Sequence, residues 1–242
     1  MVRLNLRDHG ETAHLNEEMF HSARTQEVVD AVSELCSDVA TGPVGVLGYS
    51  LGGNFALRVA RATGLPTLAV CPAVDPDRTM HAIDHGWTGY RLYFVRKWQQ
   101  ALASKQRAFP ARYDFAQALK LRSVSALTDH FVRDHTDYPN TRAYFDRYTL
   151  TGQALAGTEA TVVYAADDPV IPASDFTELA PGIELVRLAL GGHCAFLDHP
   201  RRPSWIDRYA AAHFAEQLGS AQITPPEDSS PMRSADSPSN SR

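Results

Sequence analysis

Residues 44–70 contain the pattern that most restricts the fold of this 242-residue chain. Residues 44–47 are a short apolar run without polar alternation, as expected for a strand that is covered on both faces. This run leads into Gly48 and then into a helical pattern over residues 51–62, and a second apolar run follows over residues 65–70. A strand, a helix and a further strand in this order form a βαβ unit, which predicts a parallel sheet with helices on its faces.

The rest of the chain extends this alternation. Residues 2–6 alternate apolar and polar side chains and stop at Asp8-His9-Gly10, which predicts a strand that ends in a turn. Apolar positions recur at helical spacing over residues 23–40, before Gly42-Pro43. Later in the chain we expect, in order, a strand over 161–165, a short helix over 173–179, a strand over 184–188 and a helix over 205–218.

The stretch from residue 77 to residue 150 interrupts this alternation, because its pattern is helical throughout and it is rich in aromatic and basic residues. We interpret it as a helical cap inserted into a core formed by residues 1–76 and 151–218. Residues 219–242 are rich in Ser and Pro and contain almost no large apolar side chain, so we predict a disordered tail there.

Composition excludes several classes of protein. The formal net charge of −5 gives no concentration of Lys and Arg that would bind nucleic acid. Three distant cysteines predict neither a disulfide framework nor a metal site, and His81 and His85, although four residues apart, have no evident third ligand. No signal-like start and no apolar run of membrane-spanning length occur, so we expect a cytoplasmic protein without membrane insertion, metal or cofactor.

The sequence Gly48-Tyr49-Ser50-Leu51-Gly52 lies where the predicted buried strand meets the predicted helix. In this context G-x-S-x-G forms a sharp turn that exposes the serine hydroxyl, and its glycines are needed because a Cβ would collide with the neighbouring strand or helix. Ser50 is therefore the candidate nucleophile. The backbone amide of Leu51, at the start of the helix, is the candidate donor to an oxyanion.

A serine nucleophile requires a base and a group that orients that base. Asp168 follows the strand predicted over 161–165, and we choose it as the acid, with Asp167 as the alternative. His193 follows the next strand on the flexible pair Gly191-Gly192, and it is the candidate base. Cys194 lacks an activating partner of its own, so we expect it to serve in packing.

These segments together resemble the YheT/ABHD branch of the α/β-hydrolases, also called AB hydrolase 4. The resemblance covers about residues 2 to 218 and is carried by these segments: Asn5-Leu6-Arg7-Asp8-His9-Gly10, His14-Leu15-Asn16, Phe20-His21-Ser22, residues 48–54, residues 165–169 and residues 191–196. It implies an α/β-hydrolase fold and a charge-relay set of Ser50, Asp168 and His193. Members of this branch carry earlier strands and a His-Gly loop with a second oxyanion donor, so we expect this chain to be N-terminally truncated or its start to be misplaced.

The resemblance and the motifs predict a serine hydrolase for carboxylic esters, as an esterase, a lipase or an acyltransferase. Its partner would be a small-molecule or lipid ester. The alternative is a catalytically impaired hydrolase-fold protein that serves as a binding module, and the absent oxyanion loop motivates it. The sequence assigns no substrate-binding residues, acyl-chain length or oligomeric state.

Overall fold

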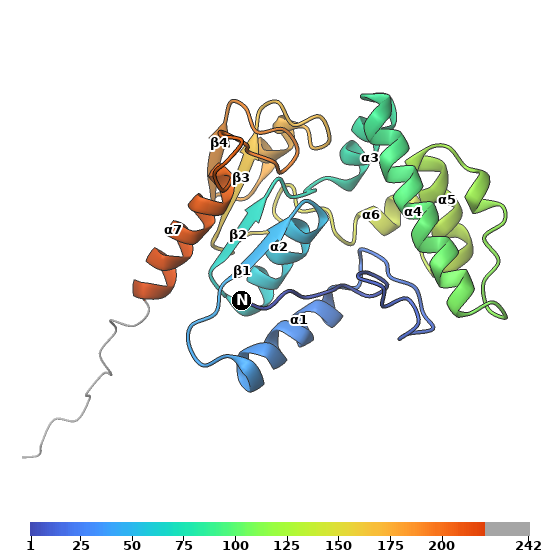
Figure 1. The fold of residues 1–242 in the computed structure, drawn as a ribbon, viewed down its shortest axis with the longest axis horizontal. Coiled ribbons are helices and arrows are strands. Elements are labelled where there is room, and N and C mark those ends of the chain that lie inside the picture. Colours follow the sequence, from blue (N-terminus) through green and yellow to red (C-terminus); the bar gives the residue numbers. More distant parts are fainter. Residues whose placement is uncertain (221–242) are drawn as a thin grey trace, which may run out of the picture.

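The computed structural model describes residues 1–220, and its centre is a four-stranded parallel sheet (Figure 1). The strands lie in chain order across the sheet: β1 (Val46–Tyr49), β2 (Thr67–Val70), β3 (Ala160–Ala165) and β4 (Ile183–Leu188). All three neighbouring pairs are parallel, with Gly48 opposite Ala69, Val70 opposite Val163 and Ala165 opposite Leu188. The predicted parallel α/β architecture is confirmed.

Helices cover both faces of this sheet (Figure 1). The residues of β2 point alternately to the two faces, as expected for a strand. Ala69 packs in one buried cluster with Leu57 of α2 (Leu51–Thr63), whereas Leu68 and Val70 pack in another with Ile206 of α7 (Trp205–Ser220). Helix α1 (Thr25–Glu34) continues into a π-helical turn, η1 (Leu35–Val39), and packs on the outer side of α2.

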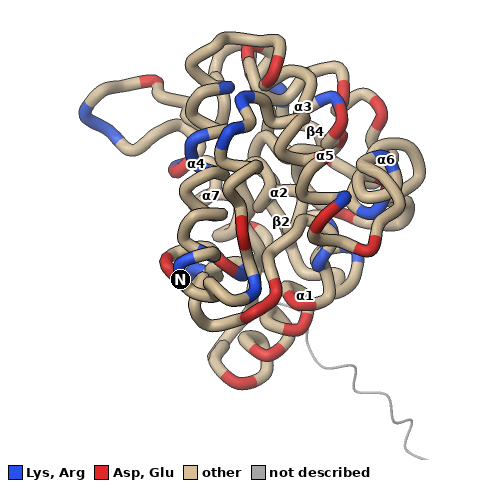
Figure 2. Tube along the Cα trace, turned by 90° about the vertical axis from the view of Figure 1, so that its right-hand side faces the viewer, with Lys and Arg blue, Asp and Glu red and all other residues tan. Residues whose placement is uncertain are grey.

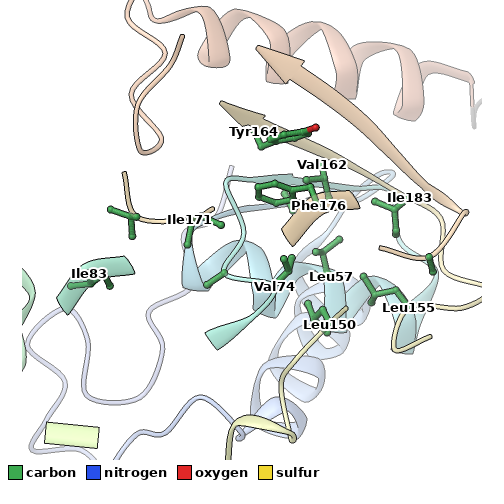
Figure 3. Close-up of a cluster of buried hydrophobic side chains, with 14 residues drawn as sticks. Leu57, Val74, Ile83, Leu150, Leu155, Val162, Tyr164, Ile171, Phe176 and Ile183 are labelled. Atoms are coloured by element: carbon green, nitrogen blue, oxygen red, sulfur yellow. The ribbon is translucent and has the colours of Figure 1, made fainter. Parts of the chain in front are cut away.

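The largest buried cluster lies between α2 and the sheet and extends to the segments that follow β3 (Figure 3). Tyr164 of β3 stacks on Phe176 with ring centroids 4.2 Å apart, and Leu57 and Val162 are fully buried beside them. Each such aliphatic or aromatic side chain stabilises the fold by about 1.5–3 kcal/mol when it is fully buried. The cluster therefore fixes the loops that leave the carboxyl ends of these strands.

Residues between β2 and β3 are predominantly helical. They form α3 (Pro76–His85), α4 (Thr88–Ala108), the 3-10 helix η2 (Ala118–Lys120), α5 (Val124–His135) and α6 (Thr141–Phe145). Local sequence explains several of these starts, because the side chains of Asp75, Ser123 and Asn140 accept hydrogen bonds from backbone N–H groups in the first turns of α3, α5 and α6.

Three details differ from the sequence prediction. The strand predicted over residues 2–6 is wrong: the segment forms no strand, and Val2 and Leu4 are exposed. Alternating apolar and polar side chains alone do not make a strand, because the backbone N–H and C=O groups of a strand also need a neighbouring strand for hydrogen bonding. The short helix over residues 173–179 is a 3-10 helix, η3 (Ala173–Glu178), and β1 and β2 begin at Val46 and Thr67, each two residues later than predicted.

Charged positions of both signs are spread over most of the trace (Figure 2). Within residues 1–220, no helix has the length and apolar character needed to cross a membrane. The tail predicted from residue 219 onward lies outside the described residues, apart from its first two residues, which end α7.

A buried lysine joins the N-terminal segment to α4. The side chain of Lys105 is only 1% exposed, and its Nζ lies 2.9 Å from Oδ1 of Asp8, whose side chain is 10% exposed. The same ammonium group donates to the backbone carbonyls of Ala13, Asn16 and Glu18. This contact explains why residues 8–18 keep a defined path although they contain no helix or strand.

We predict that Lys105→Met lowers the free energy of unfolding by about 3–5 kcal/mol, because it leaves the Asp8 carboxylate without its buried partner. Lys97→Met, on the exposed side of the same helix, is the matched control, with an expected change of no more than about 1 kcal/mol from its contact with the Tyr93 ring. Urea unfolding of both variants measures the difference. Equal stability of the two variants would contradict this account of Lys105.

His21 should make stability depend on pH. Its ring packs edge-on against Tyr138 and Tyr144, and its Nδ1 is buried without a partner among the described residues. Burial, followed by the charge of Arg24, lowers the pKa of His21 from 6.5 to about 4. The unfolded chain therefore binds a proton that the folded protein resists, and stability falls as the pH drops from about 6.5 to 4, by up to about 3 kcal/mol from this residue.

His21→Phe keeps the ring contacts but cannot titrate, so its stability should fall less over this pH range. The exposed His14 supplies the control variant His14→Gln, whose pH dependence should match the wild type. Thermal unfolding between pH 4 and pH 7 compares the three proteins. A parallel pH dependence of His21→Phe and the wild type would rule out His21 as the source.

Candidate active site

Ser50 occupies the sharp turn between β1 and α2. Its φ of 51° and ψ of −120° are unusual for a residue with a side chain, as expected at a strained strand-to-helix turn. A Cβ added to Gly48 would lie 2.2 Å from the carbonyl oxygen of Gly52, so position 48 accepts only glycine without a shift of the backbone. At Gly52 the prediction is wrong, because a Cβ added there would meet nothing within 4 Å, so the close approach of strand and helix requires glycine at position 48 alone.

Backbone and side-chain hydrogen bonds hold this turn in place. The Ser50 N–H donates to the carbonyl of Val70 at the end of β2, and the Ser50 carbonyl accepts from the N–H groups of Asn54 and Ala73. The buried Asn54 side chain donates to the carbonyls of Ala73 and Tyr148, at 2.8 Å each. The hydroxyl group of Ser50 is thus carried on a rigid support.

The structure brings Ser50, His193 and Asp168 together from the loops after β1, β4 and β3. His193 Nε2 lies 2.9 Å from Ser50 Oγ, and His193 Nδ1 lies 3.0 Å from Asp168 Oδ2. A carboxylate only accepts hydrogen bonds, so Nδ1 carries a proton, and in the neutral form of the ring Nε2 is the acceptor for the Ser50 hydroxyl. The Asp168 side chain is 1% exposed and that of His193 is 12% exposed, so little water competes for these bonds.

The two neighbouring aspartates have different contacts. Asp168 Oδ1 accepts the N–H groups of Val170 and Ile171, which leaves Oδ2 directed at the imidazole of His193. Asp167 Oδ1 instead accepts the N–H groups of Gly191 and Gly192, at 2.8 and 2.9 Å. Asp168 contacts the imidazole, and Asp167 contacts the loop that carries it.

The histidine loop folds back tightly on itself. Gly192 has a φ of +57°, in the region that favours glycine, and Cys194 and Phe196 also have positive φ values. The Phe196 N–H donates to the Gly191 carbonyl, and the Phe196 side chain is buried against the sheet. This compact turn holds the imidazole over the carboxyl edge of the sheet.

Two effects compete at the imidazole of His193. Burial opposes protonation, but the hydrogen bond to Asp168 and the adjacent Cys194 sulfur favour it. The balance raises the pKa of His193 from 6.5 to about 9. The surroundings therefore stabilise an imidazolium, which is the state that a histidine reaches when it accepts a proton.

Leu51, the candidate oxyanion donor, is the first residue of α2. The first N–H groups of a helix have no acceptor within that helix, and the helix dipole favours negative charge there.

His81 and His85 lie on α3 and stack on each other, with ring centroids 4.0 Å apart. Nδ1 of His85 contacts the backbone carbonyl of His81, and neither ring is part of the hydrogen-bonded group of Ser50, His193 and Asp168.

The prediction that Cys194 has no activating partner is wrong, because its thiol lies beside His193 and Cys71. The thiols of Cys71 and Cys194 lie next to the imidazole of His193, with Cys194 Sγ 3.9 Å from Nε2. Cys71 follows the end of β2 and is distant from His193 in the sequence, so only the pairing of the strands brings them together.

Comparison with known proteins identifies the family of this chain. The model of the alpha/beta hydrolase family matches residues 2–203. This chain belongs to the α/β-hydrolase family. The protein of Escherichia coli (strain K12) named "Putative esterase YheT" is 24% identical over an alignment of 218 positions, which covers 80% of this chain and 64% of that protein. The chain thus spans slightly less than two thirds of the length of this relative.

Solved structures of hydrolases have a similar fold. The serine hydrolase CCSP0084 from Cycloclasticus zankles superposes with a TM-score of 0.50 at 15% identity, over 90% of this chain and 78% of that one. An alpha/beta fold family hydrolase from Bacillus anthracis strain Sterne has a TM-score of 0.48, also at 15% identity, over 80% of this chain and 74% of that one. At such identities the likeness concerns the fold alone.

Proposed function

We propose that this chain is a serine hydrolase that cleaves carboxylic esters through an acyl-enzyme on Ser50. The observation that carries the proposal is the continuous hydrogen-bonded chain from Ser50 Oγ through His193 to the buried carboxylate of Asp168. A serine hydroxyl is a weak nucleophile until an adjacent base accepts its proton. In this proposal His193 is that base, and Asp168 is the group that orients it. The word esterase in the name of the Escherichia coli relative favours an ester as the bond that is cleaved.

In the proposed reaction, Ser50 Oγ attacks the ester carbonyl carbon while His193 Nε2 takes the hydroxyl proton. Asp168 stabilises the imidazolium that forms, and the Leu51 N–H donates to the carbonyl oxygen as it becomes negative. Collapse of this intermediate breaks the ester C–O bond, and His193 returns the proton to the departing alcohol. Water, activated by the same imidazole, then releases the acid and regenerates Ser50.

An alcohol in place of that water would give acyl transfer from the same acyl-enzyme. We therefore propose a small-molecule or lipid ester as substrate, with hydrolysis as the reaction to be tested first. Nucleic acid has no role in this chemistry.

We further propose that residues 77–150 act as a cap inserted into a core formed by residues 1–76 and 151–218. Two contacts support this division. The Leu150 N–H donates to the Val74 carbonyl at 2.8 Å, so the stretch leaves and re-enters the core at adjacent points. The bond from Asn54 to the Tyr148 carbonyl joins that same point to the start of α2. A segment tied at its base beside the nucleophile is well placed to bound a substrate pocket.

We predict that Ser50→Ala lowers the hydrolysis of short-chain aryl esters by at least about 10⁴-fold, since the acyl-enzyme can no longer form. Ser33→Ala, on the exposed side of α1, is the control and should retain wild-type activity. Release of the aryl alcohol measures all three proteins. Activity that survives Ser50→Ala overturns the mechanism, and a folded wild type without activity favours a binding module.

The two aspartates make a sharper test of roles. Asp168→Asn should lower kcat by about 10⁴-fold, because an amide favours the wrong tautomer of His193. Asp167→Asn should lower kcat by no more than about tenfold, because its amide oxygen still accepts the Gly191 and Gly192 N–H groups. If Asp167→Asn is the more damaging change, Asp167 is the acid of the triad.

A further inference from the structure

Three side chains of types that bind metals lie close together, and one of them is the proposed base, His193. One donor atom each from Cys71, His193 and Cys194 lies within 4.8 Å of the other two. Cys71 is fully buried at the end of β2, and Cys194 Sγ lies 3.8 Å from the Val70 carbonyl and 3.9 Å from His193 Nε2. The hydrolytic chemistry proposed above uses neither thiol.

The spacing of these donors is within about 1 Å of that around a small tetrahedral ion, since no two of the three atoms are more than 4.8 Å apart. Zn²⁺ binds thiolate sulfur at about 2.3 Å and imidazole nitrogen at about 2.0–2.1 Å, which places neighbouring donor atoms about 3.4–3.8 Å apart. The Cys194 Sγ to His193 Nε2 distance of 3.9 Å is close to this range without any rearrangement. Two sulfurs and one imidazole favour Zn²⁺ over hard cations such as Mg²⁺ or Ca²⁺.

The environment of His193 also suits a metal ligand. A histidine that binds zinc through one ring nitrogen usually donates the other N–H to a carboxylate, which fixes the ring and its tautomer. Asp168 makes this contact with Nδ1 at 3.0 Å, which leaves Nε2 for the metal. Two thiolates balance the charge of Zn²⁺, so binding releases two thiol protons and creates no net charge in a buried place.

We propose that Cys71, His193 and Cys194 form a zinc-binding site whose occupation switches off Ser50. Nε2 has one lone pair, and Ser50 Oγ lies 2.9 Å from the same atom. A bound ion would hold that lone pair, so His193 could not accept the Ser50 proton. The inhibitory part of this inference rests on the proposed function, whereas metal binding itself does not.

Cobalt is the probe for binding, because Co²⁺ replaces Zn²⁺ and its bonds to thiolates absorb in the near ultraviolet. We expect the full chain, kept reduced by a phosphine, to bind one equivalent of Co²⁺ with a thiolate charge-transfer band that Zn²⁺ abolishes. Cys71→Ala and Cys194→Ala should each weaken Zn²⁺ binding by at least about 100-fold in competition with a chromophoric chelator. Cys36→Ala, at the remaining cysteine on η1, is the matched control and should bind as the wild type does.

The activity arm compares each protein with itself. Zn²⁺ should inhibit ester hydrolysis by the wild type and by Cys36→Ala, a chelator should restore it, and hydrolysis by Cys71→Ala should be insensitive to the same Zn²⁺ concentration. Absence of the charge-transfer band in the wild type overturns the site, whether or not the variants fold. A band that depends on both cysteines in a protein without esterase activity would leave the site standing and overturn the proposed function instead.

Discussion

The polypeptide turns from β1 into α2 with no room for a side chain at residue 48, and the geometry of the site depends on this close approach. The carbonyl of Gly52 fills the space that a Cβ would need, and Ser50 is held at a φ of 51° as a result. A strained residue persists only where its surroundings over-determine it. Here the surroundings are the hydrogen bonds of Ser50 to Val70, Asn54 and Ala73, which join the turn to β2 and to the loop behind it.

The remainder of the site follows from the parallel sheet. Parallel strands end at the same edge, so the loops after β1, β3 and β4 deliver Ser50, Asp168 and His193 to one place although they lie far apart in the sequence. Distant contacts secure the surroundings of that place. Lys105 fixes the N-terminal segment to α4, and the pairing of Leu150 with Val74 closes the base of the helical stretch.

The sequence was sufficient for much of this arrangement because its strongest signals are local. A buried strand runs into G-x-S-x-G, and Asp168 and His193 directly follow apolar runs. Because parallel strands end at the same edge of a sheet, these features predict that the three residues meet. The separate contacts of Asp167 and Asp168 could not be predicted, since they depend on which backbone N–H groups each carboxylate faces. The strand expected over residues 2–6 failed because local alternation contains no information about a pairing partner. The proximity of Cys71 to His193 was not predicted, because it depends on the pairing of β2 with β3 and of β3 with β4.

We propose that the hydrogen bonds through His193 make Ser50 a nucleophile. Labelling with a fluorophosphonate tests it most directly, because this reagent phosphonylates an activated serine and needs no knowledge of the natural substrate. We predict a single adduct, located on Ser50 by mass spectrometry, with a labelling rate that falls at least about 10³-fold in His193→Ala. An adduct on another residue, or a rate in His193→Ala equal to that of the wild type, would contradict it.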